Sequence, residues 1–219
     1  MSLQDAVRSY ALVPLNSEPG TKYLYSNPGI NVAGRIIEVA SGMKYEQFLD
    51  QRLFGPLGMK DTTFWPSEAQ LKRLAKSYQT IKDKAGLVET KVSAMRHPLS
   101  DRSRHPFPGG GLFSTAADVA IFGQMVLAGG VYREKRYLSE AAVKEMTSRQ
   151  TPEGLTSYGL GFSVGPDTFG HGGAYATNLT IDKKRGLVYV FMVQHAGGGN
   201  VGPALTMFRK TAEGLHGKR

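Results

Sequence analysis

The sequence contains no cysteine, which rules out disulfides, thiolate zinc sites and a cysteine nucleophile. Long apolar runs are missing too: none approaches the roughly 20 residues that a membrane-spanning helix needs, so we expect no membrane span. Internal repeats and low-complexity segments are also lacking. With 219 residues, 41% of them hydrophobic and 21% charged, the chain has the composition of a globular domain.

The formal net charge of +9 does not come from one long basic run. Its basic residues are scattered in short groups, which favours a solvated surface over a nucleic-acid groove, and we expect no nucleic-acid partner. No metal-ligand spacing or nucleotide-binding glycine loop stands out, so we expect neither a metal nor another cofactor. The densest basic groups are Lys72-Arg73, Lys82 to Lys84, Arg133 to Arg136 and Lys183 to Arg185.

Two helices are predicted in the first quarter of the chain. Apolar residues recur at helical spacing from Pro28 to Ala40, with Asn27 as the predicted N-cap and Gly42 as the stop. The proline at the start suits the first turn of a helix. A second helix is predicted over Tyr45 to Phe54, ending at the turn residues Gly55 to Gly58.

Further helices are predicted in the middle of the chain. One runs from Thr115 to about Ala128, where Thr115 and Asp118 are expected to form a short-armed capping box and two glycines end the helix. Another is predicted over Ser139 to Arg149. The weakly patterned segment from Ser77 to Arg104 is expected to form a short hairpin and then a long loop.

The carboxy-terminal part has the pattern of an antiparallel sheet. A hairpin-like turn over Asp182 to Gly186 joins two of its strands, and a closing helix is predicted from Pro203 to Leu215. We therefore expect an α+β fold. Residues 1–150 form a mainly helical subdomain that packs, as one compact unit, on the antiparallel strands and helix of residues 151–219. The predicted strands are Tyr158 to Val164, Tyr175 to Ile181 and Leu187 to Gln194.

Two short clusters are candidates for chemistry. Tyr25-Ser26-Asn27 precedes a predicted helix, so the tyrosine lies near backbone N–H groups and the positive end of the helix dipole. His171-Gly172-Gly173 is expected just before a strand, where glycines let a substrate approach the backbone closely. Spacing alone favours a structural interpretation of each cluster, with Tyr25 as a half-buried structural tyrosine and His171 as a turn histidine.

In order, the motifs resemble those of the serine β-lactamase family, including its class C enzymes, D-amino-acid peptidases and esterases. The resemblance spans nearly the whole chain. It rests on PGT…YSN followed by a helix ending in Ser-Gly, on PLGM-x-DT-x-F, on PGGGLFSTAADVAIFGQMVLAGG from Pro108, and on YGLGF and FGHGG. It implies a β-lactamase/transpeptidase-like fold.

The resemblance also implies roles for individual residues. Tyr25 would share the proton network of a nucleophilic serine, and Asn27 would hydrogen-bond the substrate amide. His171-Gly172-Gly173 would be the sheet-edge element beside the substrate, and the N–H of Ala174 would be one oxyanion-hole donor. Gly172 lacks the hydroxyl that penicillin-recognising members use to hold a carboxylate. The substrate is therefore expected to be an ester, amide or D-peptide more than a β-lactam.

The family's Ser-x-x-Lys nucleophile motif is missing upstream of Tyr25. The sequence matches it only at Ser41 to Lys44, where Gly42 breaks the helix, so Lys44 is not one helical turn from Ser41. Ser41 also lies about fourteen helical residues, or roughly 20 Å, beyond Asn27. We therefore expect a fragment that lacks the nucleophile helix and amino-terminal strands and is inactive alone. Without those strands one sheet edge is uncovered, and we expect a homo-oligomer through it.

Two other interpretations stay open. Gly161-Phe162-Ser163-Val164-Gly165 fits the G-x-S-x-G motif, and Asp182 and His195 follow in α/β-hydrolase order. That motif needs a strand, a sharp turn and a helix, whereas Ser163 is predicted inside a strand that leads to another strand. The second interpretation is a non-catalytic ligand-binding module of the same fold that uses the same cleft.

Overall fold

The computed structural model describes all 219 residues except 1, 82–85, 93–94, 197–200 and 217–219. A four-stranded antiparallel sheet in the order β5-β6-β7-β8 forms its centre. The helices are α1 (Leu3–Tyr10), α2 (Asn27–Ser41), α3 (Tyr45–Leu49), a π-helix (Asp50–Phe54), α4 (Gly55–Leu57), α5 (Glu68–Leu71), α6 (Ala116–Leu127), α7 (Glu140–Thr147) and α8 (Gly202–His216). The strands are β1 (Ser77–Thr80), β2 (Leu87–Thr90), β3 (Val131–Tyr132), β4 (Lys135–Arg136), β5 (Ser163–Val164), β6 (Thr168–Gly172), β7 (Asn178–Asp182), β8 (Leu187–Phe191) and β9 (His195–Ala196).

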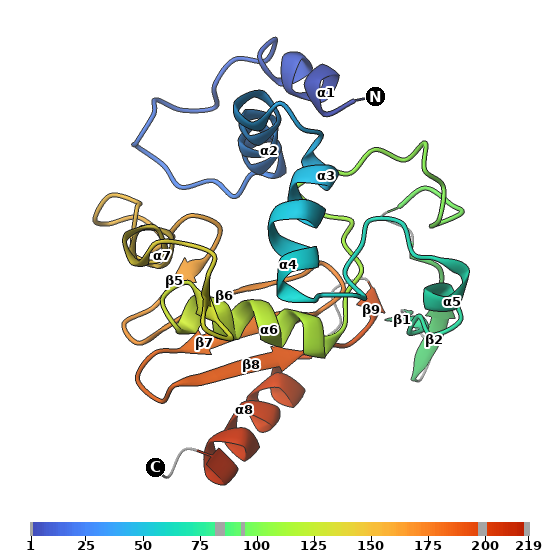
Figure 1. Ribbon diagram of the computed structural model, residues 1–219, viewed down its shortest axis with the longest axis vertical. Helices are drawn as coiled ribbons and strands as arrows, with labels where there is room; N and C mark the ends of the chain where they lie inside the picture. Colours follow the sequence, from blue (N-terminus) through green and yellow to red (C-terminus); the bar gives the residue numbers. More distant parts are fainter. Residues whose placement is uncertain (1, 82–85, 93–94, 197–200, 217–219) are drawn as a thin grey trace.

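Helices cover both faces of the central sheet. Helix α6 packs on one face, against β7 and β8, and α8 lies on the other face (Figure 1). Gly123 of α6 allows this contact, because a Cβ there would come within 2.5 Å of Val188 Cγ1. The core beneath α6 contains the fully buried side chains of Met125, Val126 and Ile181. The α+β class predicted from the sequence is therefore confirmed.

A smaller sheet has the order β2-β1-β9. Strands β1 and β2 form the short antiparallel hairpin predicted after Ser77. Strand β9 then pairs with β1 in parallel, with Tyr78 opposite His195. This sheet brings the residues after β8 beside a segment from the middle of the chain. The hairpin β3–β4 was not predicted; Arg133 and Glu134 at its turn both have positive φ, 46° and 64°.

Helix α2 begins one residue earlier than predicted, and its N-cap is Ser26 rather than Asn27. Ser26 is extended, at φ −142° and ψ 111°, and its hydroxyl accepts a hydrogen bond from Gly29 N–H at 3.1 Å. Asn27 is thus the first helical residue. The predicted stop is confirmed, because Gly42 adopts a left-handed φ of 67°, which a glycine accepts without strain.

The second predicted helix does not end at Gly55. Helix α3 passes into the π-helix and then into α4, which ends at Gly58 with φ 74°. Pro56 lies where the π-helix passes into α4.

The capping box predicted at the start of α6 is only half formed. Thr115 caps the helix by accepting from Asp118 N–H at 3.2 Å. The Asp118 side chain does not return to the cap. It accepts instead from Asp61 N–H at 2.8 Å and from the Thr62 hydroxyl at 2.9 Å, so tertiary contacts outcompete the local one. The next predicted helix is confirmed as α7, which is capped by Ser139 and ends at Thr147, two residues before the predicted end.

Strand boundaries in the carboxy-terminal part differ from those predicted. The segment from Tyr158 to Val164 is mostly a turn, because Gly159 N–H donates to Phe162 O at 2.8 Å and Gly161 has φ 87°. Only Ser163 and Val164 form β5. The segment containing His171 is itself a strand, β6, and the following strand starts later than predicted, at Asn178.

The second strand of the predicted hairpin, β8, ends at Phe191 rather than Gln194. The closing helix is confirmed as α8. In the part of the chain that the structure describes, no helix combines the length and the apolar character required to cross a membrane.

Candidate active site

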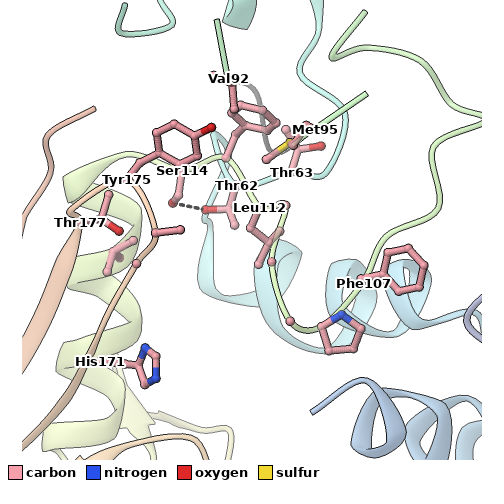
Figure 2. Close-up of a pocket in the computed structure, with 18 of the residues that line it drawn as sticks. Thr62, Thr63, Val92, Met95, Phe107, Leu112, Ser114, His171, Tyr175 and Thr177 are labelled. Atoms are coloured by element: carbon pink, nitrogen blue, oxygen red, sulfur yellow. Dashed lines mark hydrogen bonds between the residues drawn. The ribbon is translucent and has the colours of Figure 1, made fainter. Parts of the chain in front are cut away.

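A cleft of about 1600 Å³ lies between the helical part of the molecule and the central sheet. Figure 2 shows its interior, with His171 directed into the open space from the sheet side. All the site residues predicted from the sequence line this one cleft: Tyr25, Asn27, His171, Gly172, Gly173 and Ala174. The fold therefore brings together two short motifs that are far apart in the sequence.

Tyr25 lies immediately before the N-cap of α2, as the sequence predicts. Its side chain is 58% exposed, and its ring centroid is 5.8 Å from that of His171. The two rings are tilted by 30°. The phenol thus stands at the amino-terminal end of a fifteen-residue helix and next to the imidazole.

Asn27 lies in the first turn of α2, against a glycine-rich segment. A Cβ on Gly109 would stand 3.2 Å from Asn27 Cβ, so this close approach depends on glycine. The buried Asn31, one turn along the helix, fixes the contact: its carbonyl accepts from Gly109 N–H at 2.9 Å, and its amide donates to the Tyr10 hydroxyl at 3.1 Å. Helix α2 and the glycine segment therefore form one wall of the cleft.

His171 belongs to β6, opposite Leu179 of β7. Its Nδ1 is 2.5 Å from the carbonyl oxygen of Gly172, which can only accept a hydrogen bond. Nδ1 therefore carries a proton, and in the neutral ring the lone pair is on Nε2. Strand β5 pairs with β6 only as far as Gly170, so the His171 end of β6 forms an edge within the described chain.

The residues after His171 turn the chain from β6 into β7. Gly173 N–H donates to Thr177 O at 2.8 Å, and Ala176, with φ 66°, donates to Gly173 O at 2.9 Å. Ala174 lies at the exposed tip of this turn. Its N–H has no hydrogen-bond acceptor among the described residues, which leaves it available to a ligand in the cleft.

Sequence reasoning missed Tyr158 as a residue of the site. Its ring meets that of His171 edge-on, with centroids 6.1 Å apart, and lies 5.4 Å from the ring of Tyr23. Burial is the main cause that raises the pKa of the Tyr158 phenol above its usual value, and Tyr23 and Tyr25 add to it. The available signal was the YGLGF motif, which begins at Tyr158 but was interpreted as a strand.

A hydrogen-bonded chain of side chains was also missed. The Thr62 hydroxyl donates to the buried carboxylate of Asp118, so the hydroxyl of Ser114, 2.7 Å away, donates to Thr62 (Figure 2). Ser114 and Thr62 both line the cleft. These hydrogen bonds join the start of α6 to the loop after α4. No local pattern predicts it, because its members come from distant segments.

Neither alternative serine has the geometry of a nucleophile. Ser41 is the last residue of α2, and its hydroxyl donates to Ile37 O at 2.6 Å and accepts from Met43 N–H. Lys44 has an extended backbone as the N-cap of the next helix, so it is not one helical turn from Ser41.

Ser163 lies in β5, and the following turn leads to β6 rather than to a helix. This is the context that excludes a nucleophile elbow. The acid that would complete a triad, Asp182, is already bound by the N–H of Arg185 at 2.8 Å and by its guanidinium at 2.9 Å. In the described part of the chain, no three acidic, histidine or cysteine side chains gather as a metal site.

The family model described as "Beta-lactamase" matches residues 2–212. A protein of Salmonella agona (strain SL483) named "Putative D-alanyl-D-alanine carboxypeptidase" is 27% identical over 203 residues, which are 82% of this chain and 46% of that protein. This chain therefore spans about half the length of the curated relatives that it matches.

Two solved structures have the same fold. One is simvastatin synthase (LovD) from Aspergillus terreus, with a TM-score of 0.77 and 21% identity, over 96% of this chain and 61% of that one. The other is EstCE1, described as a hydrolase with promiscuous acyltransferase activity. Its TM-score is 0.76 and its identity 20%, again over 96% of this chain and 61% of that one. The predicted β-lactamase/transpeptidase-like fold is confirmed.

Proposed function

Because the chain belongs to the β-lactamase family, we propose that it supplies the tyrosine–asparagine and histidine–glycine walls of a serine hydrolase site. The reaction is acyl transfer from an ester, amide or D-peptide through an acyl-enzyme. One observation supports this most strongly: Tyr25, Asn27 and the segment from His171 to Ala174 line a single cleft.

Each wall suits one part of an acyl-transfer reaction. Tyr25, beside His171 and the start of α2, is in position to share the proton that a serine loses on attack. Asn27 can hydrogen-bond the amide or ester of the substrate. The N–H of Ala174, with no acceptor among the described residues, suits the negatively charged oxygen of a tetrahedral intermediate.

The nucleophile is proposed to come from a Ser-x-x-Lys segment outside this sequence. Ser41 and Ser163 are both engaged in local structure that a nucleophile does not have. Removal of a nucleophile abolishes covalent catalysis almost completely, so the 219-residue chain alone is expected to be inactive.

Active-site labelling tests the location of the nucleophile. The purified chain is expected to show no burst with p-nitrophenyl acetate or nitrocefin, and no mass increase after incubation with a fluorophosphonate. Stoichiometric labelling would contradict the proposal. The variants Ser41→Ala and Ser163→Ala would then show which serine carries the label.

Ligand binding tests the two walls directly. A small neutral amide, N-methylbutanamide, is expected to bind the chain, as measured by NMR chemical-shift titration. Asn27→Ala removes one hydrogen bond to the amide and should weaken binding about fivefold. Replacement of the exposed Asn16, which lies outside the cleft, by alanine serves as the matched control. Equal binding by both variants would argue against the role of Asn27.

A second candidate is a non-catalytic module that binds ligands in the same cleft. The observation that favours it is the presence of the cleft in a sequence without a geometrically suitable Ser-x-x-Lys. Reading the genomic frame upstream of the Met1 codon discriminates the two. A Ser-x-x-Lys motif there supports the hydrolase, and a stop codon without one supports the binding module.

A further inference from the structure

We propose that Tyr158 is a positioning residue of this site, whose ring holds the imidazole of His171 in one orientation and in one tautomer. The inference rests on the proposed function, since it assigns a role within the same site. Two observations carry it: the contacts that surround the His171 ring, and the hydrogen bonds that fix the backbone on both sides of Tyr158. Both are contacts within the described chain.

The imidazole of His171 is restrained in three ways. Its Nδ1 donates to Gly172 O at 2.5 Å. The ring of Tyr25 is tilted by 30° from the imidazole, with the centroids 5.8 Å apart. The ring of Tyr158 meets the imidazole at 87°, with the centroids 6.1 Å apart. One ring at a small angle and another at nearly a right angle are both accommodated by only one orientation of the imidazole.

The hydrogen bond to Gly172 does not fix the imidazole without the neighbouring rings. Gly172 is exposed at the end of β6, where water competes for its carbonyl. The tautomer of a neutral histidine follows the hydrogen bonds that its two nitrogens make, so a ring free to rotate exchanges between tautomers. With Nδ1 bound to Gly172, the lone pair is on Nε2, which has no hydrogen-bond partner among the described residues. The ring orientation therefore decides which nitrogen is available to a partner in the cleft.

The backbone at Tyr158 is held by the loop that follows α7. Tyr158 N–H donates to the Thr151 hydroxyl at 3.2 Å, and Tyr158 O accepts from Gln150 N–H at 2.8 Å. The Thr151 hydroxyl donates in turn to Thr156 O at 2.7 Å. Both backbone polar groups of Tyr158 are thus engaged, so its ring projects from a fixed position.

The residues after Tyr158 are tied to α7. Leu160 N–H donates to the carbonyl of Met146, the penultimate residue of that helix, at 3.0 Å. A Cβ on Gly159 would come within 2.5 Å of the same carbonyl oxygen, so this close approach depends on glycine. Gly159 N–H also closes the turn by donating to Phe162 O at 2.8 Å. The segment that carries Tyr158 is therefore anchored to a helix.

The ring of Tyr158, rather than its hydroxyl, makes the contact with His171. The hydroxyl has no hydrogen-bond partner among the described residues. Burial is the main cause that raises the pKa of this phenol, so the ring is uncharged at neutral pH and meets the imidazole as an aromatic surface. The ring of Tyr23, with its centroid 5.4 Å away, restrains that of Tyr158 in turn. Phenylalanine is therefore expected to replace Tyr158 in this role, and an aliphatic residue is not.

Nitrogen-15 NMR of the His171 side chain tests the proposal, because the shifts of Nδ1 and Nε2 report which atom carries the proton. Spectra are recorded at pH 8, where an ordinary imidazole is neutral. The unmodified chain is expected to show one dominant tautomer, with the proton on Nδ1. Tyr158→Leu keeps an apolar side chain but removes the ring. It should raise the share of the Nε2-protonated tautomer by about threefold or more.

Two further variants control this measurement. Tyr158→Phe restores the ring and should restore the tautomer of the unmodified chain. Tyr78→Leu is the same substitution at a 36% exposed tyrosine of β1, outside the cleft, and should leave the His171 tautomer unchanged. A merely structural role of Tyr158 predicts lower stability with an unchanged tautomer. That result, an equal change in Tyr78→Leu, or no restoration by phenylalanine would overturn the proposal.

One measurement needs no variant. In the unmodified chain, nuclear Overhauser effects are expected from the ring protons of His171 to those of both Tyr25 and Tyr158, because the rings are in contact. Their absence at Tyr158 would overturn the proposal even if Tyr158→Leu failed to fold.

Binding of N-methylbutanamide separates this inference from the proposed function. If Tyr158→Leu changes the tautomer but the amide does not bind the unmodified chain, the positioning role stands and the proposed hydrolase site fails. If the amide binds and Asn27→Ala weakens it, but the tautomer does not respond to Tyr158→Leu, the proposed site stands and the role of Tyr158 is wrong.

Discussion

At the scale of single residues, Asp118 ties the start of α6 to the loop after α4, beside the cleft. Its carboxylate is 7% exposed and accepts from Asp61 N–H and the Thr62 hydroxyl. Asp118→Ala leaves both donors without an acceptor. It should lower the free energy of unfolding by about 3 kcal/mol in urea denaturation. The control Glu153→Ala, at an exposed site, should change it by less than about 0.5 kcal/mol.

Tyr45 makes the stability of the protein depend on pH in the alkaline range. Burial raises the pKa of its phenol to about 12, from a usual value near 10. The folded state therefore retains a proton that the unfolded state loses, and stability falls as the pH rises from about 10 to 12. The free energy of unfolding should therefore fall by about 2 kcal/mol less in Tyr45→Phe than in the parent protein over this pH range. Parallel pH profiles of the two proteins in urea would refute this expectation.

The residues of the site could be predicted from the sequence only through the resemblance of ordered motifs. Periodicity alone left Tyr25 and His171 as ordinary structural residues, because nothing local shows that two distant segments meet. The same limit explains why Tyr158 and Ser114 were missed. Their partners, His171 and Thr62, belong to other segments, and only the folded chain brings them together.

At the scale of elements, α2 packs closely against the glycine-rich segment, and both line the cleft. A Cβ on Gly34 would come within 2.1 Å of Pro108 Cγ. Gly34→Ala should therefore force the two elements apart and destabilise the protein by about 1 to 3 kcal/mol, despite alanine's better helix propensity. The matched control is Gly214→Ala in α8, where a Cβ meets nothing within 4 Å.

Gly214→Ala is expected to have the opposite sign, because it gains helix propensity without a clash. It should raise stability by up to about 1 kcal/mol. Thermal unfolding followed by circular dichroism measures both variants. A stabilising Gly34→Ala would show that the segment from Pro108 onward moves freely relative to α2.

Helices were predicted better than strands, and the physical reason differs in each case. Helix ends carry local signals, such as the caps Thr115 and Ser139, so α6 and α7 were found. Strand β6 reads Thr-Phe-Gly-His-Gly, with two glycines that weaken strand propensity, and only pairing with β5 and β7 makes it a strand. Conversely, the segment from Tyr158 looks strand-like but turns at Gly161, whose φ is 87°.

At the scale of the whole molecule, two surfaces are unusual for an isolated chain. Strand β8, Leu187–Phe191, pairs only with β7 among the described strands, so its other edge has free backbone groups. It carries no charge or proline of the kind that protects natural edges. The outer face of α2 is also apolar and exposed, with Ile36 at 61% and Val39 at 68%. Both surfaces favour association.

We expect the chain to self-associate through the free edge of β8. The mass from light scattering should increase with concentration, and the outward-facing amides of β8 should exchange hydrogen more slowly as the oligomer forms.

The double variant Ile36→Glu, Val39→Glu removes the apolar face of α2 and leaves β8 unchanged. It therefore shows whether the oligomer forms through β8 or through α2. Persistence of the oligomer in this variant, with protected β8 amides, places the contact at the edge. Loss of the oligomer places it on α2. A monomer at all concentrations would show that twist and the flanking helices, α6 and α8, already shield the edge from a second strand.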